Sequence, residues 1–457
     1  MSNAVPTPKR VPFVETDFRC IRTPIPVPES IPILEQLYRD EPRSMRGQGC
    51  VVWDRAEGFQ VHDAWGNTWI DWSSGVLVAN AGHGRPEVLD AICDQAKRQL
   101  IHNYCFPSEI RGKLVHQLAT LAPDPLEKVF LLTTGSETTE VAIKLARTHG
   151  RAIGGDTKIA IVSFEGAFHG RTLGAQMIGG IPALKEWIVN LDPDMVQVPF
   201  PDGFRCEDTS FEFFLKTLGG KGFGPDRIAG VISETYQGGS AAFWPKDYAQ
   251  KMRQWCKDHD IVLVFDEVQA GFGRTGKLWG FEHYDVVPDL ICCGKGITSG
   301  LPLSALIGRA DLIDQYPPGS MTSTHTGNPV CAAAALANLD IIMGENLPAK
   351  AAQSGTVLQK GLSEIQHRHA DICAASMGKG MVAGLHIVKP GGIEPDPRMA
   401  ADIVTRCAEK GLLMFHPVGL DSATVKIAPP LITPEEAVAE GLSVLEEAIE
   451  EARNERE

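Results

Sequence analysis

The sequence predicts an α/β fold: a large domain with a doubly wound, mostly parallel sheet, and a smaller α+β domain built from both chain ends. Three observations support this fold class. The 457 residues are 43% apolar and 22% charged, which is ordinary for a globular protein of two to three domains. Short β-branched runs alternate with longer helical patterns between residues 128 and 344. After Gly344 the pattern changes to α+β.

Residues 1–75 are expected to contribute to the small domain. A proline-rich stretch at 24–32 is followed by two strand candidates, GCVVWD at 49–54 and GFQVHD at 58–63. The opening segment has no apolar stretch of the kind found in secretory signals. We therefore expect a cytoplasmic protein whose first residues pack with its last ones.

Residues 76–344 are expected to form the large domain. Several strand candidates are apolar on both faces, which is typical of a sheet covered by helices on each side. The six expected strands lie at 128–133, 158–164, 228–233, 261–267, 289–293 and 303–308. The longest expected helices lie at 136–150, 245–260 and 328–343.

Residues 345–457 are expected to form the rest of the small domain. The expected elements are a helix at 348–369, a strand at 381–388, a helix at 397–410, a strand at 424–428 and a helix from Pro434. His367 and His369 lie in the first, polar helix without metal-ligand spacing. We predict that both are solvated and that the protein has no metal site.

Charge and composition exclude several classes of function. The 43 basic and 57 acidic side chains give a net charge of -14, which disfavours binding to nucleic acid or to anionic lipid. No apolar run approaches the about 18 residues of a membrane span. The eleven cysteines include no C-x-x-C pair, and the adjacent Cys292 and Cys293 fit a buried strand. A small-molecule enzyme is the remaining expectation.

Residues that follow the strands are the first candidates for a site, because ligands of open α/β sheets bind at the carboxyl ends of the strands. The strand at 128–133 leads into Thr134-Gly135-Ser136 and a helix. Gly135 permits a tight turn, and the Ser136 hydroxyl with the free helix amides suits a phosphate. An ordinary helix cap at Ser136 is an equal alternative.

Two further strand ends carry charged residues. The strand at 261–267 ends in Asp266, and a buried carboxylate is costly unless it meets a cation such as a protonated cofactor ring nitrogen. A helix cap or an ion pair is the alternative for Asp266. Lys295 follows the strand at 289–293 between two glycines, an unusual place for a solvated lysine. It is a candidate Schiff-base amine.

The two glycine-rich segments do not match the patterns of nucleotide-binding loops. Residues 294–300 read G-x-G-x-x-x-G, which is not the dinucleotide spacing, and residues 219–224 lack the Walker spacing and are expected to form a surface loop. A phosphate site, a ring-nitrogen acid and a Schiff-base lysine together indicate pyridoxal phosphate.

With these residues, the chain resembles the class III (ω-) aminotransferases, enzymes of PLP fold type I. The resemblance runs from about residue 40 to 450 and is most specific over 261–308. It implies pyridoxal 5'-phosphate as the cofactor. Lys295 would form the Schiff base and then move the substrate proton, Asp266 would keep the ring nitrogen protonated, Gln269 would contact the ring hydroxyl, and Glu234 would be an acid close to Asp266.

The resemblance also implies the rest of the cofactor site. Phe168, where the family often has Tyr, would stack on the ring, and His169 would lie near it. Gly135 and Ser136 would hold the phosphate, together with Thr324 of a partner subunit. The resemblance therefore implies a homodimer with shared active sites, and it leaves open whether dimers pair into tetramers.

Two positions depart from the family. Members that use glutamate and 2-oxoglutarate have an arginine that clamps the α-carboxylate, where this chain has Lys426, and a gate glutamate, where it has Gly239. A lysine does not reproduce the bidentate guanidinium fork. Either the enzyme uses a different acceptor, or it has no dicarboxylate substrate.

The resemblance thus implies an aminotransferase that moves an amino group from a primary amine or ω-amino acid to a small 2-oxo acid such as pyruvate. The alternative is a lyase or racemase of the same family, for example an ammonia-lyase on a hydroxylated aminoethylphosphonate. Lys426 and Arg171 would meet an anionic group of the substrate, and Val76, Tyr104 and Phe106 would make its pocket partly apolar.

Overall fold

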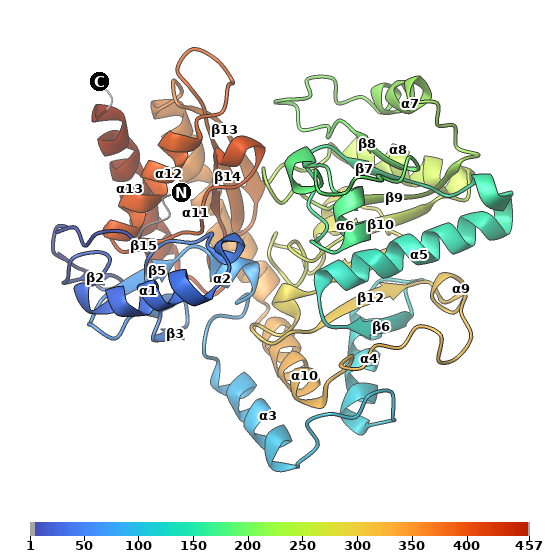
Figure 1. Cartoon of the computed structure of the whole chain (residues 1–457), viewed down its shortest axis with the longest axis horizontal. Helices are drawn as coiled ribbons and strands as arrows, with labels where there is room; N and C mark the ends of the chain where they lie inside the picture. Colours follow the sequence, from blue (N-terminus) through green and yellow to red (C-terminus); the bar gives the residue numbers. More distant parts are fainter. Residues whose placement is uncertain (1–4, 456–457) are drawn as a thin grey trace. The chain divides into compact units, whose positions relative to one another are not determined.

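The computed structural model describes residues 5–455, which fall into two compact units (Figure 1). One unit runs from Pro86 to Ala349. The other combines the described residues up to Arg85 with those from Lys350 onward. These boundaries lie somewhat later in the chain than the 75/76 and 344/345 boundaries expected from the sequence.

The unit of residues 86–349 contains a seven-stranded sheet with the order β6-β12-β11-β10-β9-β7-β8. Its strands are β6 (Lys128–Leu132), β7 (Ala160–Phe164), β8 (Met195–Val198), β9 (Ile228–Glu234), β10 (Val262–Asp266), β11 (Leu290–Cys293) and β12 (Ser304–Gly308). All neighbours pair in parallel except β12, which is antiparallel to both β11 and β6. The mostly parallel sheet was predicted; the direction of β12 and the existence of β8 were not.

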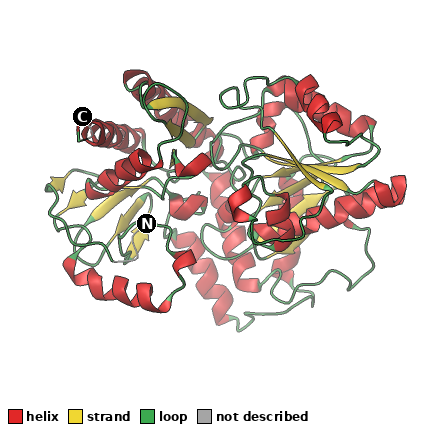
Figure 2. Ribbon diagram, turned by 45° about the horizontal axis from the view of Figure 1, so that its top comes forward, coloured by secondary structure: helices red, strands yellow, loops and turns green. Residues whose placement is uncertain are grey.

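Helices cover this sheet on both faces, as the apolar strands predicted (Figure 2). On one face, α5 (Gly135–Gly154) packs against β9, β11 and β12, with Ala142, Leu145 and Ala146 in the core. On the other face, α8 (Lys246–Asp258) and the 3-10 turn η5 (Gly280–Tyr284) pack near β10. Buried aromatic rings fill the space between them, including Trp244, Phe265 and Tyr284.

Shorter elements complete this unit. The helix α10 (Pro329–Gly344) packs against α3 (Pro86–Lys97) and α4 (Glu109–Leu121). The alanines at 332–335 of α10 are buried, so this run serves helix packing. The remaining elements are α6 (Leu173–Ile178), α7 (Phe211–Gly220), α9 (Ala310–Ile313), η3 (Gly155–Thr157), η4 (Pro182–Leu184) and η6 (Lys295–Ile297).

The unit of both chain ends has two sheets. The first has the order β1-β2-β5-β4-β3, with β15 paired to β5, and the second has the order β13-β14-β16. The strands are β1 (Val14–Glu15), β2 (Cys20–Ile21), β3 (Arg55–Glu57), β4 (Gln60–His62), β5 (Thr68–Asp71), β13 (Cys373–Lys379), β14 (Val382–Ile387), β15 (Leu412–Leu413) and β16 (Thr424–Ile427). Because β15 pairs with β5, the two chain ends share one sheet.

The helices of this unit include the three that were expected after residue 345 and two, before residue 80, that were not expected. They are α1 (Ile31–Asp40), α2 (Ser74–Leu77), α11 (Leu347–Arg368), α12 (Pro397–Glu409) and α13 (Glu435–Asn454), with 3-10 turns η1 (Pro28–Ser30), η2 (Arg43–Met45) and η7 (Leu420–Ser422). Leu442, Leu445 and Ile449 of α13 are buried.

Three local predictions for this unit were wrong or incomplete. Residues 49–54 form no strand, because Cys50 and Val51 pack from a loop against the cluster that contains Ile21 and Trp69. The strand β13 was missed. His369 is buried, not solvated, and lies next to Glu446 of α13.

Within residues 5–455, no single helix has the length and apolar composition of a membrane span, although the bent pair α10 and α11 would pass by these two measures together.

Candidate active site

A cavity of about 310 Å³ opens at the carboxyl edge of the large sheet. Its volume lies within the range of small-molecule sites. It is lined by residues that follow β6, β7, β9, β10 and β11: Thr134, Gly135, Ser136, Phe168, His169, Gly170, Arg171, Glu234, Asp266, Val268, Gln269 and Lys295. The structure therefore brings together eight predicted cofactor and catalytic residues, with Arg171 beside them.

The amino end of α5 forms one wall of the cavity. Thr134 is the N-cap, in a reciprocal capping box with Glu137, so the alternative that Ser136 is the cap is wrong. Ser136 lies in the first turn, where its Oγ accepts the amide hydrogen of Arg171 at 3.0 Å. Within residues 5–455, no protein acceptor engages the amides of Gly135 and Ser136. Free amides at a helix amino end attract a phosphate.

Asp266 and His169 form a buried pair on a second wall. The His169 Nδ1 lies 2.8 Å from the Asp266 Oδ2, and both side chains are at most 6% exposed. The other carboxylate oxygen of Asp266 accepts the amide hydrogen of Val268 at 3.1 Å. Burial alone lowers the pKa of His169, but its hydrogen bond to Asp266 and the charges of Asp266 and Glu234 outweigh burial and raise it. Asp266 is thus oriented from two sides, by the His169 ring and by the Val268 amide.

Glu234 lies at the end of β9, beside Asp266 in the sheet register. Its two oxygens accept amide hydrogens from Phe168 and Gly238, each at 3.0 Å. The predicted acid close to Asp266 therefore also fixes the backbone of Phe168, the residue expected to stack on the ring.

Lys295 projects from a strained turn at the end of β11. Its φ is +44°, a left-handed value that costs a non-glycine residue roughly 1 to 2 kcal/mol. The preceding Gly294 is extended, so the strain lies on the lysine itself. Asn338 of α10 donates to the carbonyls of Gly296 and Ile297 at 2.8 and 3.1 Å and holds this turn. Strain that the surroundings maintain is typical of functional residues.

Burial lowers the pKa of Lys295, and the negative charges of Asp266 and Glu234 oppose this effect. A lowered lysine pKa raises the fraction of neutral amine, which is the form that attacks a carbonyl carbon or accepts a proton. Arg171 lies nearby, with its guanidinium carbon 5.5 Å from the centre of the Phe168 ring.

Three residues predicted for the site do not line this cavity. Thr324 lies on an exposed turn, and Tyr104 and Phe106 lie on the loop between α3 and α4. The turn and the loop contact each other, because the Tyr104 hydroxyl donates to Thr322 at 2.7 Å. Phe106 is 72% exposed.

The remaining two predicted residues belong to the unit of both chain ends. Val76 is exposed in α2, where four successive residues from Ser74 to Leu77 have positive φ values of 50° to 65°. Lys426 is buried in β16, opposite Gly384 of β14. The roles of Val76 and Lys426 in substrate binding stay predictions.

Sequence reasoning missed three residues of the cavity wall: Thr134, Gly170 and Val268. Gly170 has a φ of +132°, and a Cβ there would lie 2.0 Å from the Ser136 Oγ. The glycine after His169 was a usable signal, because a conformation of this kind favours glycine. Thr134 also had a local signal, because Thr134-x-x-Glu137 is the pattern of a capping box. The part played by Val268 depends on long-range packing and left no local signal.

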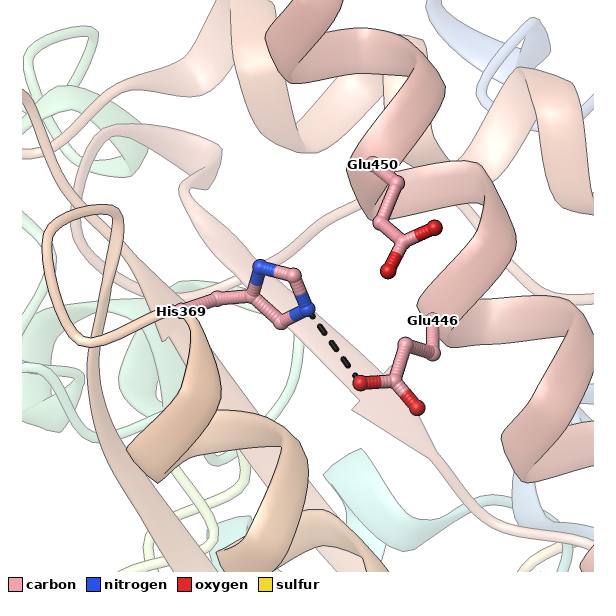
Figure 3. Close-up of side chains that lie close together, drawn as sticks. All are labelled: His369, Glu446 and Glu450. Atoms are coloured by element: carbon pink, nitrogen blue, oxygen red, sulfur yellow. Dashed lines mark hydrogen bonds and ion pairs between the residues drawn. The ribbon is translucent and has the colours of Figure 1, made fainter.

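A second cluster, outside this cavity, contains His369, Glu446 and Glu450 (Figure 3). The His369 Nε2 lies 3.3 Å from Glu446, but Arg368 already pairs with both Glu446 oxygens at 2.5 and 2.9 Å. Figure 3 shows the Nδ1 of His369 on the side of the ring away from the two carboxylates. We read this cluster as an ion-pair network between α11 and α13 and assign no metal to it.

The residues of the cavity fit pyridoxal 5'-phosphate. The α5 amides and Ser136 suit its phosphate, the buried and oriented Asp266 suits a protonated ring nitrogen, and the partly buried Lys295 supplies the amine. The second ring nitrogen of His169 is buried without a partner among residues 5–455, as expected where a ligand completes the wall.

Comparison with known proteins agrees with this site. The sequence profile of the class-III aminotransferases matches residues 44–449. The chain is 34% identical to a probable 4-aminobutyrate aminotransferase of Bacillus subtilis, over 86% of this chain and 91% of the relative. It is 33% identical to an isoleucine 2-epimerase of Lentilactobacillus buchneri, over 88% and 91%.

Solved structures give the same result. An amine transaminase of an uncultivated Pseudomonas species, solved in its PLP-bound form, superimposes with a TM-score of 0.82 at 27% identity, covering 91% of this chain and 97% of that one. The sheet and its helices are therefore those of PLP fold type I. The chain belongs to the class-III aminotransferases, a family of enzymes that depend on pyridoxal 5'-phosphate.

Proposed function

We propose that this enzyme transfers an amino group from a primary amine or ω-amino acid to a small 2-oxo acid such as pyruvate. The observation that carries the proposal is the meeting of the Lys295 amine, the Asp266–His169 pair and the amino end of α5 in one cavity. Such a site would hold pyridoxal phosphate at three points. The bound cofactor supplies an electron sink for a carbanion.

The chain's own residues perform the remaining work. The pKa of Lys295, lowered by burial, favours the neutral amine that accepts and returns the substrate proton. Asp266, oriented by His169 and Val268, would hold the ring nitrogen in its protonated form. Glu234 fixes the backbone of Phe168, so that this ring would limit motion on one face of the cofactor.

The choice of a small 2-oxo acid rests on Lys426 and Gly239. A lysine offers a point charge in place of a planar fork, and a glycine cannot shield an arginine, so a dicarboxylate acceptor would be held weakly. A monocarboxylate such as pyruvate needs less charge compensation.

A racemase or a lyase is the second candidate. The similarity to an isoleucine 2-epimerase favours the racemase. For a lyase, Arg171 at the cavity and Lys426 would meet a phosphonate, as in a hydroxylated aminoethylphosphonate. Both alternatives use the same cofactor and the same proton transfer by Lys295.

We also propose a homodimer in which each subunit completes the other's site, and we leave pairing into tetramers open. The loop that carries Tyr104 contacts the exposed turn of Thr324, and its apolar side chains Ile101 and Phe106 are 60% and 72% exposed. Apolar residues this exposed suit burial against a second copy. Phe106→Asp should therefore shift the sedimenting mass to that of a monomer and weaken cofactor binding.

A cytoplasmic location stays a prediction.

The deciding experiment mixes holoenzyme with candidate amines and no acceptor. Transamination predicts one stoichiometric conversion of the bound cofactor to its aminated form, reversed by pyruvate. Continuous ammonia release would instead identify a lyase, and loss of enantiomeric excess without amino transfer would identify a racemase. Lys295→Ala should abolish every one of these reactions, and Lys257→Ala on the surface of α8 serves as the control.

The acceptor is tested separately with Lys426→Arg, Gly239→Glu and the double variant. We expect the double variant to use 2-oxoglutarate better than either single variant. If none of the three improves on the parent enzyme, these two positions do not determine the acceptor.

A further inference from the structure

Glu267 is a fully buried carboxylate for which the proposed function has no role. It follows Asp266 directly and is 0% exposed. Its oxygens accept hydrogen bonds from the Thr235 hydroxyl and from the amides of Gly280 at 2.7 Å and Phe281 at 3.0 Å. Among residues 5–455 no basic side chain forms an ion pair with it.

These three donors come from two separate chain segments. Thr235 follows β9, while Gly280 and Phe281 begin η5. A Cβ on Gly280 would lie 2.9 Å from the Thr235 Cγ2 and 3.2 Å from the Glu267 Oε1, so the close approach requires glycine. The carboxylate thus links the end of β10 to the end of the neighbouring strand β9. It also holds together the two ends of the loop 268–279.

Two contacts link the residues just after Glu267 to the cofactor site, and a third holds the backbone of Gln269. The Val268 amide donates to the Asp266 Oδ1 at 3.1 Å. The Val268 side chain lies against Gly135 of α5, where a Cβ would come within 2.9 Å of it. The carbonyl of Gln269 accepts the Tyr236 hydroxyl at 3.3 Å. A shift of Glu267 would therefore change the positions of Asp266, of Gly135 at the amino end of α5, and of Gln269 together.

The charges around Glu267 do not compensate it. Tyr236, Tyr284 and Cys293 lie near it, Asp266 precedes it on the opposite face of the strand, and none of these side chains is a cation. Burial raises the pKa of Glu267 to about 7, although its three hydrogen bonds oppose this shift. Burial of a carboxylate without a cation costs free energy. We explain this cost by the segment that Glu267 holds in place.

We propose that Glu267 is a positioning residue, whose buried carboxylate fixes the segment Glu267–Val268–Gln269 and thereby orients Asp266 and Gln269 toward the cofactor. The inference rests on the proposed function, because it assumes that these two residues contact the ring. It differs from a purely structural role, which would change stability alone.

The test compares Glu267→Gln with Asp289→Asn. Asp289 is also buried and serves β10 at its other end, where it accepts the Leu263 amide at 2.9 Å and pairs with Arg253 and Arg309. Both substitutions replace a buried carboxylate next to β10 with an amide, but only Glu267 lies beside the cavity. Thr235→Val and Thr235→Ser provide a second pair that leaves Glu267 in place.

Three quantities are measured on each holoenzyme, below its melting temperature: the dissociation constant of pyridoxal phosphate, the pH midpoint of the bound cofactor's visible spectrum, and the melting temperature. We expect Glu267→Gln to weaken cofactor binding about tenfold, the effect of one lost buried hydrogen bond, and to shift the midpoint. Thr235→Val should weaken cofactor binding about threefold and shift the midpoint in the same direction. Thr235→Ser keeps the hydroxyl and should therefore retain the values of the parent enzyme. Asp289→Asn should lower only the melting temperature.

Two results would overturn the inference. One is a cofactor affinity and midpoint in Glu267→Gln and Thr235→Val that equal those of Asp289→Asn. The other is a Thr235→Ser variant that behaves like Thr235→Val. A parent enzyme that forms no visible Schiff base through Lys295 would instead refute the proposed function itself, so the two failures are distinguishable.

Discussion

The Asp266–His169 pair provides the sharpest test of how the site works. Its two partners are buried, and the His169 Nδ1 lies 2.8 Å from the Asp266 Oδ2. His169→Leu removes both the donor and the charge. His169→Asn places a neutral amide donor close to where Nδ1 was, and so removes the charge and the ring alone. Comparing the two variants separates the contribution of the hydrogen bond from that of the positive charge.

The magnitudes follow from the kind of hydrogen bond. A hydrogen bond to a charged group contributes about 1.5 to 3 kcal/mol, so His169→Leu should lower kcat/KM by about 10- to 150-fold. A charge-assisted bond is roughly twice as strong as a neutral one, so His169→Asn should cost about half of that energy, or about 4- to 13-fold. Both variants should also shift the pH midpoint of the cofactor's spectrum, because Asp266 loses its cation.

The assay is the amine-dependent spectral change of the holoenzyme, followed by stopped flow. His369→Leu is the matched control, since His369 is likewise buried beside a carboxylate but belongs to the ion-pair network with Glu446. It should lower the melting temperature and leave kcat/KM within about twofold. The reasoning is refuted if His169→Leu retains kcat/KM within twofold with an unchanged spectrum. Equal losses in the Asn and Leu variants would assign the effect to ring packing.

Three further predictions concern stability and the phosphate site. Burial raises the pKa of Glu267 to about 7, above its usual 4.5, so the folded state holds the extra proton between these values. Protonated Glu267 therefore contributes up to about 3 kcal/mol to the free energy of unfolding. This contribution is fully present below about pH 4.5 and is lost as the pH rises through about 7. Urea titrations at several pH values should show this slope, and Glu267→Gln should remove it. Asp289→Asn should cost about 3 kcal/mol in the same titrations, because two arginines lose their buried partner. Gly170→Ala, which would drive a Cβ into Ser136, should weaken pyridoxal phosphate binding at least about tenfold by equilibrium dialysis. Gly155→Ala, at a positive φ with open space around it, is its control.

The large sheet could be predicted because its strands are short, β-branched and buried on both faces. Four residues at or just beyond the strand ends, Gly135, Ser136, Asp266 and Lys295, were found for the same reason: parallel strands deliver their ends to one edge. The direction of β12 could not be predicted, since a buried strand is equally apolar in either orientation. Its pairing with β6 and β11 depends on contacts that are distant in sequence.

Errors arose where burial did not coincide with regular structure. Residues 49–54 look like a strand because they are apolar, yet they pack against the core from a loop. His369 lies in a polar stretch, but α13 covers it. The left-handed turn at 74–77 includes Val76, a β-branched residue that rarely adopts positive φ. No local rule predicts this conformation, because its cost is offset only by hydrogen bonds from distant segments, including Ser74 to Ala428 at 2.6 Å.

Asp266 and Glu267 are adjacent acids at the end of β10, but they lie on opposite faces of the sheet and have different roles. Side chains alternate across a strand, so Val264 and Asp266 share the face that α5 covers, while Phe265 and Glu267 share the face of η5. On the first face Asp266 meets the His169 ring and the cavity. On the second face Glu267 meets only amides and a hydroxyl, which suits an anchor and not a cofactor contact. A shift of one residue in this register would exchange the two environments, and it would leave the ring nitrogen facing phenylalanine. The pairing of β10 with β9 and β11 therefore determines which of the two acids reaches the cofactor.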